Sequence, residues 1–225
     1  MAGQVEQRLL EGLLEQLQEQ GLLPASGRQR TDSTHILAAV RDLNRLERVG
    51  ETLRAALNSV AVVAPDWLQR RTPPEWYERY GRRVENYSLP KTDAARQALA
   101  ATIGGDGQLL LEAIDAADEH GWLGKVPAVQ TLRRVWAEQY IDVEGARVWR
   151  PVKDMLAPAA LMASPYDPDA RYSTQRSVEW VGYKVHFTET CDPATPHLIV
   201  NVETTPATTP DDNTRLSRIF SAHKP

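Results

Sequence analysis

The sequence of 225 residues contains a single cysteine, Cys191. One cysteine can form neither an internal disulfide nor a cysteine-based zinc cluster. No uninterrupted apolar stretch, residues 60–65 included, is long enough to cross a bilayer. Residues 1–20 are rich in Glu and Gln and lack the basic-then-apolar pattern of a secretion signal. These absences predict a cytoplasmic protein with no membrane partner.

An excess of positive charge is also missing, because the formal net charge is −4. Dedicated nucleic-acid-binding domains are usually strongly basic, so composition alone does not predict that role. No P-loop, GxGxxG fingerprint, GxSxG elbow or HExxH pair occurs, and none of the five histidines belongs to a metal-ligand pair. NTPase, dinucleotide-binding, serine-hydrolase and zinc-peptidase functions therefore lack support.

The hydrophobic spacing predicts three elements in the first part of the chain. Apolar residues three or four apart predict a helix over residues 5–17, and the polar segment 27–36 is predicted as a strand. From Leu37 the 3.6-residue period predicts a second helix that runs to about Asn58. Its charged residues are expected on a solvated, self-paired face: Arg41, Asp42, Arg45, Glu47, Arg48 and Glu51.

Residues 65–150 are predicted as further helices, which prolines punctuate and the glycine-rich segment 104–107 divides as a turn. Five tryptophans in this stretch are expected in the core: Trp67, Trp76, Trp122, Trp136 and Trp149. Alternating residues then predict strands over 179–190 and 197–205, joined as a β-hairpin by a turn at 191–196. After them, residues 204–212 indicate a strand exit and a helix start at Asp211 or Asp212. The fold class is α/β or α+β, with antiparallel strands.

Asp32 is the carboxylate with the clearest potential for chemistry. It lies where the predicted strand meets the predicted helix, and an aspartate within a strand is unusual unless it is a ligand or a cap. The alternative is that Asp32 or Ser33 caps the following helix. Basic residues that could contact phosphate are Arg28, Arg30, Arg171, Arg176 and Lys184, and each is also ordinary surface when taken alone.

Five segments of the chain resemble one group of bacterial insertion-sequence transposases of the DDE type. They are RQRTDSTHILAAVRDLNRLERVGETLRAALNSVAVVAPDWL, VPAVQTLRRVWAEQY, SPYDPDARYSTQR, WVGYKVHFTETCD and PHLIVNVETTPATTPDD, and they occur in the family's order. The resemblance extends from about residue 5 to residue 212.

The resemblance implies a ribonuclease-H-like fold in which two Asp and one Glu hold two Mg²⁺ or Mn²⁺ ions for DNA strand transfer. Asp32 matches the first Asp, on the first strand, and the hairpin matches the second and third strands. A helical segment, residues 1–25, would precede a partial domain, residues 26–225, with a helical insertion at about 60–160. The partners implied are DNA at the ends of the insertion sequence and further copies of the chain.

The second Asp of the family, in a motif like Asp-Ala-Gly-Tyr, and the final Glu have no counterpart in this sequence. We therefore expect a truncated transposase that is inactive alone, since one aspartate cannot hold two metal ions. Three alternatives stay open. The chain could be a DNA-binding or interaction remnant without catalysis, a remnant that folds poorly, or a helical structural protein unrelated to nucleic acid.

Overall fold

The computed structural model describes residues 3–24, 26–40, 43–175, 177–193 and 195–209. The chain divides into two compact units: unit 1 comprises residues 1–37 and 182–225, and unit 2 comprises residues 38–181. Helices and antiparallel strands both occur, so the mixed class predicted from the sequence is confirmed. Within the ranges just given, no helix is long and apolar enough to cross a membrane.

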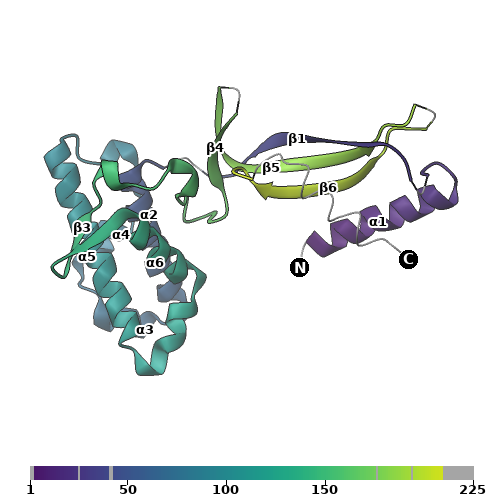
Figure 1. Cartoon of the computed structure of the whole chain (residues 1–225). Helices are drawn as coiled ribbons and strands as arrows, with labels where there is room; N and C mark the ends of the chain where they lie inside the picture. Colours follow the sequence, from purple (N-terminus) through teal and green to yellow (C-terminus); the bar gives the residue numbers. More distant parts are fainter. Residues whose placement is uncertain (1–2, 25, 41–42, 176, 194, 210–225) are drawn as a thin grey trace. The chain divides into compact units, whose positions relative to one another are not determined.

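The described residues of unit 1 form one helix and an antiparallel sheet (Figure 1). The helix, α1 (Gly3–Glu19), includes the predicted segment 5–17. The strands of unit 1 are β1 (Gln29–Leu37), the part of β5 (Val178–Thr190) from residue 182 onward, and β6 (Ile199–Pro206). β5 pairs with both of the others. The predicted hairpin is therefore confirmed as β5 and β6. The helix start expected at Asp211 or Asp212 lies outside the described residues.

The sheet of unit 1 has an apolar and a polar face, because successive side chains of a strand point to opposite sides. Residues paired across strands share a face, so the register assigns each side chain. The apolar sheet face carries Ile36, Tyr183, Val185, Phe187, Val202 and Pro206, together with Thr34, Thr204, Asp32 and, toward one end, the charged pair Arg30 and Glu189. Its Ile36 and Val202 are 39% and 45% exposed. The opposite face carries Ser33, His35, Lys184, His186, Thr188, Glu203 and Thr205.

The first long helix of unit 2 starts later than its apolar spacing suggests. α2 spans Arg45–Val63, whereas the strand β1 continues through Leu37, so the prediction of a helix from Leu37 is wrong. The Asn44 side chain accepts hydrogen bonds from the backbone N–H groups of Leu46 and Glu47, and the Glu47 carboxylate accepts from the Asn44 N–H. This capping box satisfies free donors of the first turn and fixes where the helix begins.

Unit 2 is largely helical around one hydrophobic core. Its other helices are α3 (Pro65–Arg71), α4 (Glu75–Tyr80), α5 (Asp93–Asp115) and α6 (Pro127–Gln139). A strand pair that the sequence analysis missed, β2 (Tyr140–Val143) and β3 (Ala146–Trp149), follows α6, and β4 (Arg171–Gln175) pairs with β5. Short 3₁₀ helices lie at Asn86–Ser88, Asp118–Lys125, Val152–Asp154 and Pro158–Ala160.

The tryptophans of unit 2 only partly match their expected place in the core. Trp67, Trp76 and Trp136 are buried, whereas Trp149 is half-buried and Trp122 is 46% exposed. The predicted core position is therefore confirmed for Trp67, Trp76 and Trp136, and the prediction is wrong for Trp122.

The glycine-rich segment 104–107 lies inside α5 and is not the turn that its composition suggests. Trp136 packs so close to the helix that a Cβ on Gly107 would overlap its ring, and a Cβ on Gly104 would overlap the Tyr140 ring. The Trp136 indole N–H also donates to the Gly104 carbonyl at 3.0 Å. These glycines are therefore needed for contact between helices and not for a turn.

The carboxylate of Glu51, on α2, is buried at the centre of a hydrogen-bond network in unit 2. It accepts hydrogen bonds from the Arg54 guanidinium, the Tyr166 hydroxyl and the Val84 backbone N–H. Glu47 is also buried, so the expected solvated face of this helix is wrong. Arg41 and Asp42, which were assigned to that face, lie outside the described residues.

Substitution of two glycines in α5 distinguishes helix from turn. Gly107→Ala should destabilise the protein by about 1–3 kcal/mol, because the new methyl group overpacks against Trp136. Gly105→Ala, where the added Cβ meets no atom within 4 Å, should stabilise it by about 0.5–1 kcal/mol. Urea denaturation of both variants measures these changes. A loss of stability from Gly105→Ala would contradict the helical assignment.

Glu51→Gln should lower the free energy of unfolding by about 3 kcal/mol at neutral pH, because it removes the charge that Arg54 is paired with. Burial raises the pKa of Glu51, but the hydrogen bonds from Arg54, Tyr166 and Val84 outweigh burial and hold the pKa below 4.5. A depressed carboxylate pKa stabilises the fold above the unfolded pKa, and this stability is lost as the pH falls through the folded pKa.

The difference between wild type and Glu51→Gln should therefore shrink as the pH falls below 4.5, the ordinary value for the group. Urea denaturation between neutral and acidic pH measures this trend. The matched control is Glu78→Gln, which changes an exposed glutamate of α4. A pH-independent difference for Glu51→Gln would show that the network does not hold a charged carboxylate.

Candidate functional site

Asp32 lies in the middle of β1, opposite Phe187 of β5. Its side chain is exposed, and Oδ1 accepts a hydrogen bond from the Ser33 backbone N–H at 2.8 Å. The helix that follows β1 begins at Arg45 and is capped by Asn44. The alternative that Asp32 or Ser33 caps this helix is therefore wrong. The carboxylate of Asp32 faces solvent within a strand and does not cap a helix.

Two of the predicted basic residues lie near Asp32 along the chain. Arg30 shares the face of Asp32 and forms an ion pair with Glu189, directly across from it on β5. The hydrogen bond and the charge of Glu189 raise the pKa of Arg30. The side chain of Arg28 is exposed, and its backbone N–H donates to the Asp192 carboxylate at 2.8 Å. The structure thus brings Arg30 close to Asp32 and leaves the Arg28 guanidinium in solvent.

The other predicted basic residues are not gathered at Asp32. Lys184 lies on the opposite face of the sheet and is 7% exposed, and its Nζ donates to the Thr209 carbonyl at 3.0 Å. Arg171 belongs to unit 2, where its Nη1 donates to the carbonyls of Pro168 and Ala170. Arg176 lies outside the described residues. Lys184 and Arg171 are thus engaged with backbone carbonyls of the chain itself.

The ligands for a divalent metal are incomplete around Asp32. No group of three or more His, Cys, Asp or Glu side chains that could hold an ion occurs in the part of the chain that the structure describes. The nearest carboxylate across the sheet on this face, Glu189, is paired with Arg30. His186, on the polar face, is within 3.0 Å of the Thr205 hydroxyl. Asp32 alone therefore offers one carboxylate to a metal.

A second cluster of functional side chains, which the sequence analysis missed, lies in unit 2. Arg45, assigned from the sequence to a solvated face, is half-buried against Trp149, with its Cζ 3.8 Å from the ring centroid. Arg96 and Arg150 line the same pocket although they are far apart in the sequence. The sequence offers as a signal for this cluster only the pair Trp149-Arg150 at the end of β3, which by itself does not indicate a site.

Comparison with known proteins adds no relative: no protein family, no curated protein and no solved structure matches this chain.

Asp32→Asn should change the free energy of unfolding by no more than about 0.5 kcal/mol, as for an ordinary surface substitution. The side chain is exposed, and an amide oxygen can still accept the hydrogen bond from Ser33. Thermal denaturation of the wild type and the variant measures the change. A loss of several kcal/mol would mean that Asp32 has a structural role, and activity lost in this variant could not then be assigned to chemistry.

Proposed function

We propose that the chain is part of a metal-dependent DDE transposase and that Asp32 is one of its three metal-binding carboxylates. The observation on which this rests is the position of Asp32 in mid-strand, exposed, on a strand that pairs with the β5–β6 hairpin. The resemblance assigns Asp32 to a first strand and the hairpin to the second and third. A ribonuclease-H-like fold remains part of the proposal.

The environment of Asp32 is compatible with the role of a metal ligand. Its carboxylate accepts one hydrogen bond from Ser33, and Arg30, the nearest cation on its face, is paired with Glu189. Carboxylate oxygens suit Mg²⁺ and Mn²⁺, and a bound ion would supply activation of water or of a DNA 3′-hydroxyl. Since the described residues do not complete a site, the remaining carboxylates must come from outside them.

The free edge of β1 supports the same proposal. Within the described residues, β5 is the only strand that pairs with β1, so no strand lies along the other edge of β1. Long unpaired edges are usually blunted or covered in natural proteins. A further strand added at this edge would lie next to Asp32, where a second carboxylate could reach the same ion.

The alternative function is DNA binding without catalysis, by the chain alone or with further copies of itself. The observation that favours it is the arginine-lined pocket of unit 2, which does not depend on Asp32. Binding that weakens steeply with salt, without strand cleavage, would be its signature.

The test is cleavage of DNA that carries the element's ends, in Mg²⁺ or Mn²⁺, by the chain alone and by a version extended with the second Asp and the Glu of the family. We expect no nicking by the chain alone. For the extended version we expect nicking that Asp32→Asn lowers by at least about 10³-fold, as loss of a metal ligand should. The control is Glu203→Gln, a carboxylate on the opposite face of the sheet.

Equal activity of the extended protein and its Asp32→Asn variant would contradict the assignment of Asp32. Nicking by the chain alone that Asp32→Asn abolishes would keep the assignment and disprove the expected inactivity. DNA binding without nicking by the extended protein would favour the alternative function.

A further inference from the structure

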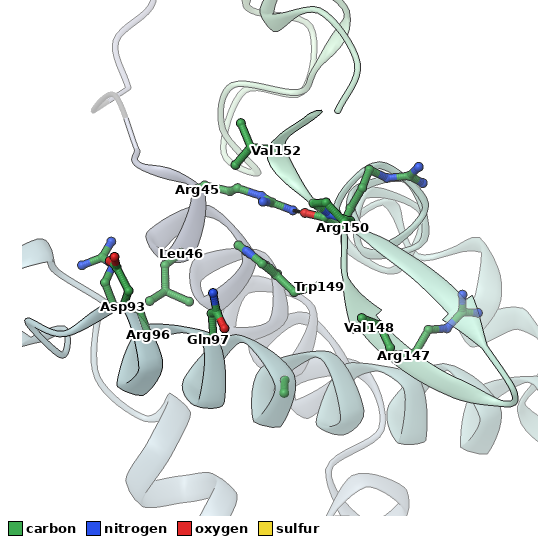
Figure 2. A pocket seen from close by; sticks show the side chains of 12 residues that line it. Arg45, Leu46, Asp93, Arg96, Gln97, Arg147, Val148, Trp149, Arg150 and Val152 are labelled. Atoms are coloured by element: carbon green, nitrogen blue, oxygen red, sulfur yellow. Dashed lines mark hydrogen bonds between the residues drawn. The ribbon is translucent and has the colours of Figure 1, made fainter. Parts of the chain in front are cut away.

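A pocket of about 690 Å³ in unit 2 lies between the first turns of α2 and α5 and the end of β3 (Figure 2). Its volume is typical of sites for small ligands, which span about 300–1,000 Å³. The lining contains four arginines and a single acidic residue, Asp93: the arginines are Arg45, Arg96, Arg147 and Arg150. The pocket is therefore positively charged in a protein whose net charge is negative.

Arg45 is the most confined of these cations. Its guanidinium lies over the Trp149 ring and donates to the Gln139 side-chain oxygen at 2.7 Å and to the Arg150 carbonyl at 2.7 Å. Neither acceptor carries a charge, so the positive charge of Arg45 is not neutralised by these contacts. Burial lowers the pKa of Arg45 to about 10, and the positive charges of Arg150 and Arg48 act in the same direction. A bound anion would offset both effects.

Further hydrogen-bond donors line the pocket. Arg96 and Gln97 lie in the first turns of α5, whose N-terminus carries the positive end of the helix dipole. One Arg96 nitrogen contacts the Pro90 carbonyl at 3.3 Å, which leaves its other N–H groups available. The Trp149 indole N–H has no hydrogen-bond partner in the described part of the chain, and Figure 2 shows it on the side of Gln97. These donors suit an oxyanion.

The two remaining arginines act at longer range. Figure 2 shows the guanidinium groups of Arg147 and Arg150 directed away from Trp149. Arg147 donates to the Gln108 side chain, and Arg150 donates to carbonyls at the end of α6. Within the described residues none of the four pocket arginines forms an ion pair with a carboxylate. Their charge therefore adds to the positive potential that an anion would meet.

We infer that this pocket binds a phosphate group of a nucleic-acid strand, through Arg45, Arg96 and the Trp149 indole N–H. Guanidinium groups match phosphate oxygens in geometry and charge, and phosphate contacts supply most of the sequence-independent affinity for DNA. The choice of nucleic acid as the source of the phosphate rests on the proposed function. The phosphate chemistry itself rests only on the pocket.

The experiment measures binding of the full chain to a fluorescein-labelled duplex of arbitrary sequence, without divalent metal, by fluorescence anisotropy at several salt concentrations. Arg96→Gln removes a cation at the rim and avoids the more structural Arg45. It should weaken binding about tenfold and reduce the salt slope by about 1. Asp93→Asn removes the only carboxylate of the lining and should tighten binding. The control is Arg82→Gln, an exposed arginine outside the pocket, which should have no effect.

The inference is overturned if Arg96→Gln and Arg82→Gln have equal effects, or if Asp93→Asn does not tighten binding. Calorimetric titration with inorganic phosphate tests the source of the phosphate. Phosphate that binds as tightly as the duplex, with both lost in Arg96→Gln, would overturn the choice of nucleic acid. Because no step requires Asp32 or a metal, failure here is distinguishable from failure of the cleavage test.

Discussion

The close contact between α5 and α6 is the constraint on which the rest of unit 2 depends. Gly104 and Gly107 leave room for the aromatic rings of Trp136 and Tyr140 against the α5 backbone. From there the aromatic contacts continue outward, because the centroid of the Tyr140 ring lies 5.2 Å from that of Trp136 and 5.2 Å from that of Trp149, which it meets edge to face. Trp149 in turn holds Arg45 at the pocket. The position of the half-buried Arg45 thus depends on Gly104 and Gly107 in the interior.

Unit 1 is organised around a sheet in which β5 lies between β1 and β6. This sheet has one apolar and one polar face. Residues on the apolar face remain partly exposed, and within the described residues no strand pairs with the outer edge of β1. A sheet of this kind gains most of its stability from what packs on it. The location of Asp32 on that face and next to that edge makes it accessible to a ligand or to additional chain.

The sequence predicted the elements whose pattern reflects local contacts and missed those that depend on distant ones. The β5–β6 hairpin follows from strict alternation, and α1 follows from its apolar spacing. The composition of segment 104–107 predicts a turn. Its glycines instead make room for the rings of Trp136 and Tyr140, and this contact cannot be read locally because those residues are about 30 positions away. For the same reason the sequence does not predict the burial of Glu51, because its hydrogen-bond partners Val84 and Tyr166 lie on distant segments of the chain. Asp32 could be singled out, but the pocket around Arg45 could not.

We propose that Asp32 supplies one of three carboxylates of a transposase active site. The most direct measurement is the nucleotide sequence that follows the codon of Pro225, translated in all three frames. The account predicts an Asp in a motif like Asp-Ala-Gly-Tyr, followed by a Glu, in one of these frames. The absence of both from every frame would contradict it, and Asp32 would then be an exposed strand residue without a catalytic role.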